Sequence, residues 1–322
     1  MFVLLWGPAR DPQLTAVGRE LGRLGVPVRS VDQRRVLGTA VELSVGAAVS
    51  AAVCVGGDRI DLAEAVAAYV RPHDSRRVAE VAAAAEGGPK QQHAAAVDAA
   101  LLCWADVTPA YVVNRPGNQT SNGSKPFQLA VIARSGFAVP ETVVTNDPAE
   151  AADFARQHGE VIFKSVSGIR SRVRRLATAE IGRLKDVLCC PTQFQRRIPG
   201  TDVRVHVVGA EVFATEVTCE ADDYRYATHQ GHAPAKLSAT ELPERIADRC
   251  RHVAAGLGLP VAGVDLRRSP DGEWYCFEVN PSPAFCYYEA ATGQPVAAAV
   301  AALLAAGMLC AAGSAREMAR HG

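Results

Sequence analysis

The chain has 322 residues, which is long for one hydrophobic core and fits two or three small domains. Hydrophobic residues make up 48% and charged residues 21% of the chain, which excludes the disordered and fibrous classes. Lys plus Arg and Asp plus Glu number 34 each, and the resulting net charge of zero predicts neither a nucleic-acid partner nor an acidic-membrane partner.

The cysteines and the two apolar ends of the chain predict a reduced, cytoplasmic protein. The nine cysteines are scattered, and no pair has the Cys-x-x-Cys spacing of a zinc or redox site. Residues 1–6 have no basic flank and are too short for a signal peptide, so they predict a buried first strand. Residues 296–312 are uncharged but mostly alanine, which favours a packed helix over a membrane span.

Residues 1–113 predict a small parallel α/β domain. Short apolar runs alternate there with Ala-rich helical stretches, and strand, helix and strand at this spacing favour a parallel sheet. The runs and stretches are residues 3–6, 13–24, 26–31, 51–55, 62–70 and 78–85. The next segment, 114–124, is dense in turn formers and predicts a linker or a domain boundary.

The rest of the chain alternates between helices and strands. A helix begins at Lys125 or Pro126 with Ser124 as its N-cap, and it ends at Gly136. The elements that follow are a helix over 148–158, a strand over 161–164 that leads into a Ser/Gly/Arg loop at 165–172, strands over 192–197, 203–208 and 211–217, a helix over 243–257, a hairpin over 261–279 and a terminal Ala-rich helix.

Three oxygen-bearing side chains fall on the last predicted hairpin and its exit. The segment 269–272 (Ser-Pro-Asp-Gly) has the residue types of a type I turn that pairs its first and last residues. This register places Asp265 opposite Cys276, with Glu278 diagonal to it on the same face. Asn280 shares that face because it lies two residues beyond Glu278 on one strand.

Such a set of donors suits a magnesium ion. Mg²⁺ prefers hard oxygen ligands, keeps several waters and completes its shell with substrate phosphates. The alternative is a solvated hairpin face, but the string Glu-Val-Asn-Pro-Ser-Pro with an upstream Asp at this distance favours a metal site. We therefore predict that Asp265, Glu278 and Asn280 bind Mg²⁺, with Mn²⁺ as an alternative ion.

An Asp on one strand and Glu-x-Asn on the next resembles the metal motif of the ATP-grasp superfamily. The resemblance extends backwards from this motif over the segment from near Asn114 to Tyr288. It implies a mixed α/β ATP-grasp fold and a homodimer or homotetramer. The implied parts are an N-terminal pre-ATP-grasp domain at 1–113, a central subdomain on the nucleotide-lid side at 114–190, and a C-terminal subdomain with the metal and catalytic residues at 191–322.

The resemblance also implies that ATP is held by a clamp of side chains. Lys164 stands where the family has a lysine on the α- and β-phosphates, and Lys125 matches the family's first nucleotide-side lysine, although a solvated lysine is the alternative at both positions. Asp202 would lie near the ribose or the hinge, and Ser282 near a phosphate. The other expected members are the hinge Gln193, Phe194 and Gln195, which holds adenine mainly by backbone groups, and Ser167, Gly168 and Arg170 of the phosphate-covering loop.

Two arginines are expected to stabilise the charge of phosphoryl transfer. Residues 200–204 resemble the Gly-x-Asp-x-Arg strand of RimK-like members, which implies that Arg204 faces the transferring phosphate, where its fork pairs two oxygens. Arg225 occupies the next family position and is the second candidate. The sequence departs from the family pattern at 165–172, which has one glycine, and at Ala227, where an Asn is usual.

The strings Asn-Arg-Pro, Ser-Asn-Gly-Ser-Lys-Pro, Lys-Ser-Val-Ser-Gly and Asp-Tyr-Arg-Tyr-Ala resemble most closely the graspetide, or microviridin-type, maturases of ribosomal peptides. This implies an ATP-dependent ligase that activates a carboxylate as an acyl phosphate and passes it to an amine or a hydroxyl, on a peptide or a small amino-acid substrate. An ATP-binding peptide scaffold without turnover and a phosphotransferase stay open as alternatives. A mobile cover over the acyl phosphate is expected from 165–172 and 221–235.

The remaining polar and reactive residues are expected to have structural roles. His206 alternates with apolar strand residues, which predicts core packing or a pocket-lining position. Cys189 and Cys190 are expected to pack near the hinge because adjacent cysteines form strained disulfides. For 285–288 (Phe-Cys-Tyr-Tyr), core packing and an acceptor pocket are open alternatives. Residues 7–10 (Gly-Pro-Ala-Arg) lack the glycine spacing of a dinucleotide-binding motif.

Overall fold

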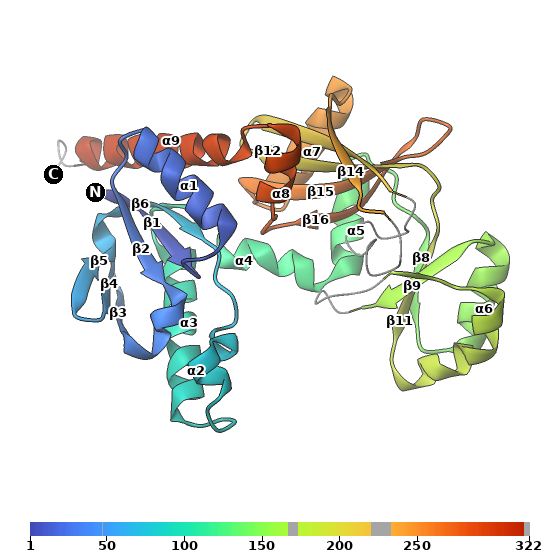
Figure 1. The fold of residues 1–322 in the computed structure, drawn as a ribbon, viewed down its shortest axis with the longest axis horizontal. Coiled ribbons are helices and arrows are strands. Elements are labelled where there is room, and N and C mark those ends of the chain that lie inside the picture. Colours follow the sequence, from blue (N-terminus) through green and yellow to red (C-terminus); the bar gives the residue numbers. More distant parts are fainter. Residues whose placement is uncertain (47, 167–172, 220–232, 319–322) are drawn as a thin grey trace.

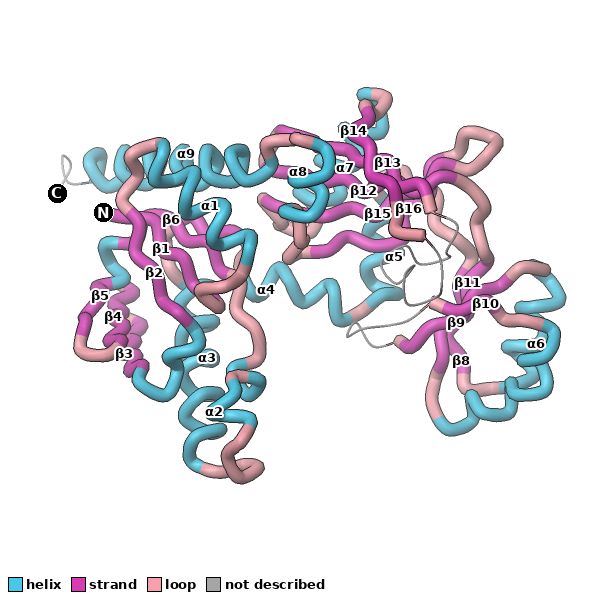
Figure 2. The backbone as a smooth tube through the Cα atoms, in the orientation of Figure 1, coloured by secondary structure: helices cyan, strands magenta, loops and turns pink. Residues whose placement is uncertain are grey.

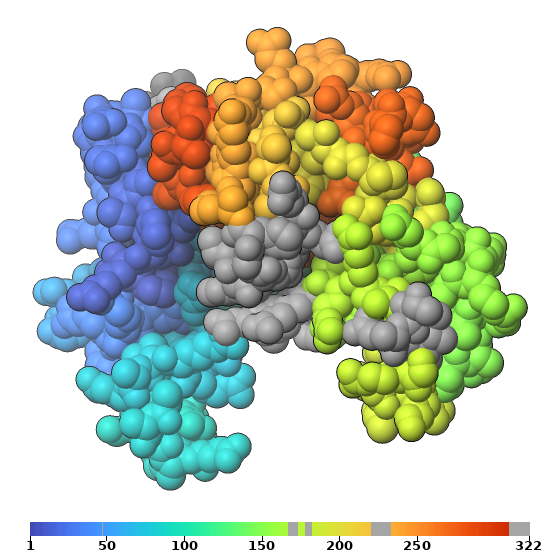
Figure 3. Space-filling view, turned by 45° about the vertical axis from the view of Figure 1, so that its right-hand side comes forward, coloured from blue at the N-terminus to red at the C-terminus, as the bar shows by residue number. Residues whose placement is uncertain are grey.

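The computed structural model describes residues 1–46, 48–166, 173–219 and 233–318, and its elements form three groups (Figure 1). The blue-to-cyan N-terminal residues and the green central residues lie on either side of the orange and red C-terminal residues (Figure 3). Among the described residues, one sheet is parallel and three are antiparallel. This arrangement confirms the predicted mixed α/β class.

The N-terminal group is built on a four-stranded parallel sheet with strand order β2-β1-β6-β7. Helix α1 begins after Asp11, whose side chain accepts a hydrogen bond from the Leu14 backbone N–H and so caps the helix. Its apolar residues recur at helical spacing and pack on one face of the sheet. The bounds are Phe2–Gly7 for β1, Pro12–Arg23 for α1, Val28–Asp32 for β2, Ala65–Val70 for β6 and Tyr111–Val113 for β7.

Two features of the N-terminal group were not predicted from the sequence. The apolar run at 51–55 lies in a separate antiparallel sheet, β3-β4-β5, which packs on the other face of the parallel sheet. Helix α3 buries Val97, Leu101 and Trp104 against the same core. The bounds are Thr39–Val45 for β3, Val49–Val55 for β4, Asp58–Asp61 for β5, Ala79–Ala82 for the short α2 and Pro89–Val107 for α3.

The segment predicted as a linker contains a short helix, α4 (Pro116–Gln119), and a 3₁₀ turn, Thr120–Gly123. Helix α5 (Lys125–Arg134) follows it and packs against the C-terminal sheet. Ser124 precedes α5 as predicted, but its side chain makes no capping hydrogen bond. The segment is therefore a structured connection between the N-terminal group and the other two groups.

The central group is a four-stranded antiparallel sheet with strand order β10-β9-β11-β8. Helix α6 and the 3₁₀ segment Thr178–Cys189 cover one face, where Phe154, Val187 and Phe194 form a small core. The other face is turned toward the C-terminal sheet and lines a pocket. The bounds are Thr142–Thr145 for β8, Pro148–His158 for α6, Val161–Ser165 for β9, Arg174–Arg175 for β10 and Thr192–Arg196 for β11.

The C-terminal group is a five-stranded antiparallel sheet with strand order β14-β13-β12-β15-β16. Its strands and those of the central sheet form two separate groups in Figure 2. Alternate residues of β12 and β15 pack on α5 and α7, so the opposite face is left for the functional side chains. The bounds are Thr201–Val208 for β12, Glu211–Thr218 for β13, Lys236–Thr240 for β14, Glu244–Gly256 for α7, Val261–Arg268 for β15, Trp274–Asn280 for β16 and Cys286–Thr292 for α8.

The terminal helix α9 (Val296–Met318) joins the C-terminal and N-terminal groups. It packs beside α1 on the N-terminal sheet, and its Val300 and Leu304 share one core with Leu5 and with Phe213 of β13. Within the described part of the chain, no helix is both long and apolar enough to cross a bilayer. The division at 113/114 and 190/191 stays a proposal, since β11 hydrogen-bonds within the central sheet and α9 packs on the first domain.

Candidate active site

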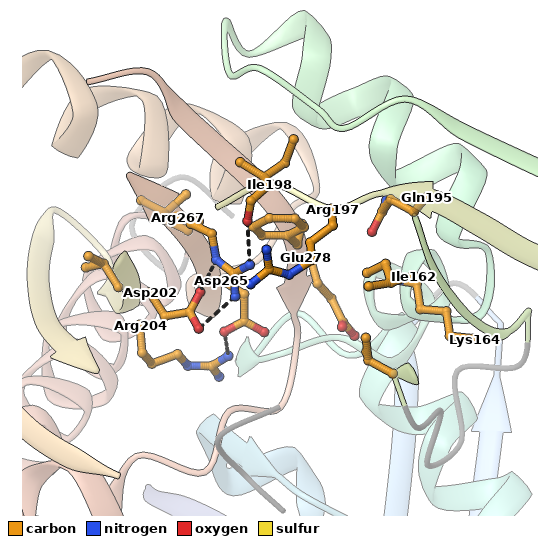
Figure 4. Close-up of a pocket in the computed structure, with 14 residues that line it drawn as sticks. Ile162, Lys164, Gln195, Arg197, Ile198, Asp202, Arg204, Asp265, Arg267 and Glu278 are labelled. Carbon is orange, nitrogen blue, oxygen red and sulfur yellow. Dashed lines mark hydrogen bonds and ion pairs between the residues drawn. The ribbon is translucent and has the colours of Figure 1, made fainter. Parts of the chain in front are cut away.

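A pocket lies between the central sheet and the C-terminal sheet. Strands β9 and β11 form one wall, and β12, β15 and β16 form the other (Figure 4). The pocket is lined by Ile162, Lys164, Val173, Gln195, Arg197, Ile198, Asp202, Val203, Arg204, Asp265, Leu266, Arg267, Phe277 and Glu278. Predicted nucleotide, metal and catalytic residues from segments far apart in the sequence therefore meet at one place.

The two carboxylates of the predicted metal site face each other directly across neighbouring strands. Asp265 on β15 pairs with Glu278 on β16. The predicted register was wrong, because Cys276 pairs with Leu266 and the register shifts between Asp265 and Leu266. Phe277 is the extra residue of this β-bulge, a feature that re-aims side chains next to functional sites. The bulge brings the carboxylates closer than the predicted diagonal arrangement.

A row of charged side chains crosses the sheet at the level of this pair. Arg204 on β12 lies beside Asp265, and its Nη1 donates a hydrogen bond to Asp265 Oδ1 at 2.5 Å. On the far side, Lys125 Nζ from α5 lies 3.9 Å from Glu278 Oε2. The side chains of Asp265 and Glu278 are 28% and 25% exposed, whereas those of Arg204 and Lys125 are 7% and 12% exposed. Two nearly buried cations thus flank two carboxylates that are open to the pocket.

The opposite wall carries Lys164 and the predicted hinge residues. Lys164 on β9 pairs with Gln193 on β11, and Gln195 lies two residues further on the same face. Gln195 Nε2 donates to Thr142 Oγ1 at 2.9 Å, while Gln195 Oε1 and the whole Gln193 amide have no hydrogen-bond partner among the described residues. The Phe194 side chain points the other way, into the core beneath α6.

Asp202 lines the pocket, but its carboxylate is already held by an arginine that the sequence analysis did not name. Arg267 Nε and Nη2 donate to the two Asp202 oxygens at 2.7 and 2.9 Å. The third donor, Arg267 Nη1, bonds to the Ile198 carbonyl oxygen at 2.8 Å (Figure 4). Asp202 therefore orients Arg267, and Arg267 in turn holds the backbone at Ile198, just after β11.

Asn280 and Ser282 are not among the residues that line the pocket. Asn280 pairs with Gly263, two residues along the strands from the Asp265 and Glu278 pair. Its Oδ1 accepts a hydrogen bond from the Ser282 backbone N–H at 2.9 Å. Four predicted residues, Ser167, Gly168, Arg170 and Arg225, lie outside the described residues, as does most of the expected cover.

The buried His206 continues the polar face of β12 beyond Arg204. Its ring lies 5.0 Å from the Tyr288 ring and 6.5 Å from the Phe285 ring, so Phe285 and Tyr288 pack in the core. Burial, and then the nearby Arg204 charge, lower the pKa of His206 well below its ordinary value. Among the described residues, neither ring nitrogen has a hydrogen-bond partner. His206 is thus packed in the core, which is one of the two predicted positions, beside the Tyr288 ring.

The comparison that decides the family covers more than half of the chain. The model of the RimK-like ATP-grasp domain matches residues 122–304. The chain belongs to the RimK-like ATP-grasp family. Membership confirms the predicted ATP-grasp fold and the predicted class of enzyme, an ATP-dependent ligase that joins a carboxylate to an amine.

Curated relatives of this ATP-grasp chain include glutamate ligases. A probable alpha-L-glutamate ligase of Sodalis glossinidius (strain morsitans) is 28% identical over 209 residues, which are 62% of this chain and 69% of the relative. A ribosomal protein bS6–L-glutamate ligase of Salmonella paratyphi B is 29% identical over 58% of this chain and 65% of the relative. These relatives match about two-thirds of their own length.

Solved structures resemble the ATP-grasp chain over nearly its whole length. The ATP-grasp ligase PsnB complexed with minimal precursor, Mg and ADP has a TM-score of 0.79 at 26% identity, over 95% of this chain and 97% of that one. The macrocyclase MdnC bound with precursor peptide MdnA from Microcystis aeruginosa MRC has a TM-score of 0.79 at 20% identity, over 95% of this chain and 99% of that one. The likeness includes the N-terminal group of elements.

The pocket of this ATP-grasp chain fits a nucleotide and a divalent cation. Asp265 and Glu278 supply hard oxygen donors side by side, and Lys164 supplies a cation on the facing wall. Among the described residues, no group of three His, Cys, Asp or Glu side chains could hold a metal ion. A pair of carboxylates still suits Mg²⁺, which is bound in nucleotide sites by one or two carboxylates together with substrate phosphates.

Sequence reasoning missed several residues that build the site. Arg267 could have been found, because it lies two residues from Asp265 on one strand and therefore shares its face. Arg197 and Ile198 line the pocket directly after strand β11. Gln128 carried no motif, yet its amide bonds to both the backbone N–H and the carbonyl of Val279, on the outer edge of β16.

Proposed function

We propose that this ATP-grasp enzyme uses ATP and Mg²⁺ to join a carboxylate to an amine or a hydroxyl on a peptide, through an acyl phosphate. The observation that carries the proposal is the row of Arg204, Asp265 and Glu278, which lines one pocket together with Lys164 and has Lys125 beside Glu278. The described lining residues include no Ser, Thr or Cys. Such a site suits phosphoryl transfer, which depends on placement and charge neutralisation rather than on a covalent nucleophile of the enzyme.

The central wall is proposed to hold the nucleotide. Lys164 would neutralise charge on the α- and β-phosphates, and Lys125 would do so from the Glu278 side. Gln195 Oε1, which is buried and without a hydrogen-bond partner among the described residues, suits the exocyclic amine of adenine. The backbone around Phe194 is proposed to complete the adenine site, with Gln193 beside it. The remaining proposed contacts are Asp202 on the hinge side, Ser282 at the phosphate end, and Ser167, Gly168 and Arg170 above the phosphates.

Asp265, Glu278 and Asn280 are proposed to hold Mg²⁺, with Mn²⁺ as an alternative ion. When bound, the metal neutralises the negative charge that builds up on the phosphates. Asn280 Oδ1 accepts one hydrogen bond from the Ser282 backbone and keeps a second lone pair for a ligand. Asp265 shares its carboxylate with Arg204, so metal binding would release this arginine toward the phosphate.

The proposed reaction has two steps. An oxygen of the substrate carboxylate bonds to the γ-phosphorus and the bond to the β-phosphate oxygen breaks, which yields an acyl phosphate and ADP. The acceptor nitrogen or oxygen then bonds to the acyl carbon, inorganic phosphate leaves, and the acceptor loses one proton. Arg204 would stabilise the charge of the first step and Arg225 that of either step, because a guanidinium fork pairs two phosphate oxygens.

A peptide is the proposed source of both the carboxylate and the acceptor. The likeness to PsnB, described with its minimal precursor, extends over 97% of that chain and includes the N-terminal group. The glutamate ligases match over about two-thirds of their length at similar identity. The extent of the match therefore favours a peptide substrate over a free amino acid.

Mass spectrometry of the product tests the proposal. Short peptides encoded beside the gene that contain Asp or Glu together with Lys, Thr or Ser are incubated with the enzyme, ATP and MgCl₂. We expect ADP to form and the peptide to lose one water for each bond made. A Glu278→Gln enzyme should produce neither change.

Other outcomes would replace the proposal by a named alternative. A gain of one phosphate on the peptide would indicate a phosphotransferase. A gain of one glutamyl residue when free glutamate is added would indicate a glutamate ligase. Binding of peptide and ATP without ADP formation, for every candidate peptide, would indicate a scaffold without turnover.

A further inference from the structure

We propose that Asn114, at the end of the N-terminal group, is a positioning residue for the loop that carries Asn280. The inference rests on the proposed metal site. Asn114 begins the string Asn-Arg-Pro, for which the proposed chemistry has no role. Its side chain is nevertheless buried, with 3% of the residue exposed, and all its polar atoms are in use.

The Asn114 amide bridges the two strands that bear the metal carboxylates. Its Nδ2 donates to the Val261 carbonyl at 2.6 Å and to the Pro281 carbonyl at 2.5 Å, and its Oδ1 accepts from the Val261 N–H at 3.1 Å. Val261 is the first residue of β15, and Pro281 directly follows Asn280, the last residue of β16. The amide therefore replaces the next rung of the strand ladder, beyond the pair of Gly263 and Asn280.

A second side chain from the N-terminal group holds the same loop. Arg71 Nη1, which follows strand β6, donates to the Pro283 carbonyl at 3.2 Å, while Arg71 Nε is paired with Asp11. The carboxyl ends of β1 and β6 form the crevice where open α/β sheets usually bind ligands. Here the chain's own Pro283 reaches that crevice, so Arg71 holds the loop that follows β16.

These contacts fix the direction of the proposed third metal ligand. The carbonyls of Pro281 and Pro283 are held from the N-terminal side, and between them the Ser282 N–H bonds to Asn280 Oδ1. If Asn114 released Pro281, the backbone around Ser282 could turn and take Asn280 with it. Residues that orient metal ligands in this way typically change metal affinity by about 10- to 100-fold when they are mutated.

Calorimetric titration of ADP, once with excess MgCl₂ and once with EDTA, measures this role without any peptide substrate. The ratio of the two dissociation constants reports how strongly the metal and the nucleotide bind together. Asn114→Asp keeps the acceptor for the Val261 N–H but turns an oxygen toward two carbonyl oxygens. We expect the ratio to fall by about tenfold or more, with ADP binding in EDTA unchanged.

Asn118→Asp is the matched control. Asn118 Nδ2 also crosses from the connecting segment to the C-terminal group, where it bonds to the Gly258 carbonyl at 2.7 Å, three residues before β15, and among the described residues its side chain has no hydrogen bond to the loop after β16. Asn118→Asp should leave the ratio as in the wild type. If Asn114→Asp does not fold, Arg71→Lys serves as the second variant, because it keeps the charge beside Asp11 and loses the reach to Pro283.

The outcomes separate this inference from the proposed function. A wild-type enzyme in which Mg²⁺ does not tighten ADP binding contradicts the proposed metal site itself. A wild-type ratio that is retained by the folded Asn114 or Arg71 variant overturns the positioning role. Equal losses in the Asn114 and Asn118 variants, or equal weakening with and without Mg²⁺, also overturn it, because they indicate general damage to the docking of the two parts.

Discussion

The N-terminal and C-terminal groups each contain an arginine paired with an aspartate, and the two pairs differ in what surrounds them. Arg71 and Asp11 have side chains only 8% and 7% exposed, and Tyr69 and Pro283 close the site. Arg204 is equally buried at 7%, but its partner Asp265 is 28% exposed and lines the pocket.

The buried pair of Arg71 and Asp11 stabilises the fold, whereas Arg204 and Asp265 lie where they can exchange partners. In the N-terminal group both Arg71 Nε and Arg71 Nη1 donate to partners within the chain, so removing Asp11 leaves an uncompensated buried charge. In the C-terminal sheet Asp265 is pushed toward the pocket beside a second carboxylate, Glu278, and Arg204 is the cation that balances them. A metal ion and a phosphate can replace that pairing without exposing either charge.

The largest expected effect is the loss of stability when the buried pair of Arg71 and Asp11 is broken. Asp11→Asn keeps the cap of α1 but leaves Arg71 without its counter-charge, so we expect the unfolding free energy to fall by about 3–5 kcal/mol. Asp265→Asn removes the partner of Arg204 but also relieves repulsion with Glu278. We therefore expect the unfolding free energy to fall by only about 1 kcal/mol or less. Urea denaturation of the two variants and the wild type measures both losses of stability. Similar losses in the two variants would contradict the difference between the pairs.

The next largest effect is on activity, when a carboxylate of the charged row at the pocket is changed. Glu278→Gln removes one proposed metal ligand without changing shape, so we expect ADP formation with substrate to fall by about 10²- to 10³-fold. The melting temperature should stay close to that of the wild type. Glu273→Gln, on an exposed residue of the turn before β16, is the matched control and should retain full activity.

A smaller effect on activity is expected when a methyl group is added next to the Arg204 guanidinium. A Cβ on Gly263 would lie 2.0 Å from Arg204 Nη2 and 2.9 Å from Pro283 Cβ. Gly263→Ala should therefore displace the guanidinium and lower the rate of ADP formation by about tenfold, or about 1.4 kcal/mol. Gly256→Ala meets nothing within 4 Å and should leave the rate unchanged. An unchanged rate in Gly263→Ala would indicate that Arg204 does not need this position.

The smallest effect concerns the pH dependence of stability at His206. Its pKa is lowered in the folded chain by burial and by Arg204, so below a pH of about 6.5 the unfolded chain binds a proton that the folded chain does not. Stability is therefore lost as the pH falls, by up to about 1.4 kcal/mol per unit from this group. His206→Phe should remove that part of the slope, measured by denaturation between pH 5 and 7.5, and a slope equal to the wild type would contradict it.

The sequence predicted which residues meet at the pocket better than their exact pairing, because residue types and spacing are local while register is not. The turn at Ser269 forms as expected, with the Gly272 N–H bonded to the Ser269 carbonyl at 2.9 Å. The ladder starts one residue later, since the Ser269 N–H bonds to Glu273, and the bulge at Phe277 adds a second shift. Both shifts depend on packing between strands, which a turn motif does not encode.

Contacts between distant segments were the other part beyond reach of the sequence. Nothing near Asp202 indicates that Arg267 will hold it, and nothing in the alanine pattern of α9 indicates which sheet it covers. Asn114 was part of a recognisable string, but its partners lie more than 140 positions away. Such contacts are fixed by how the three groups of elements dock and not by propensity or periodicity.

Electron paramagnetic resonance of Mn²⁺ in the presence of ADP tests most directly whether the open carboxylate pair holds a metal against a nucleotide. We predict that the wild-type chain binds Mn²⁺ with ADP and that the Asp265→Asn/Glu278→Gln chain binds it at least about tenfold more weakly. Equal Mn²⁺ affinity in the two folded chains would contradict the account, because the metal would then be held somewhere other than on β15 and β16.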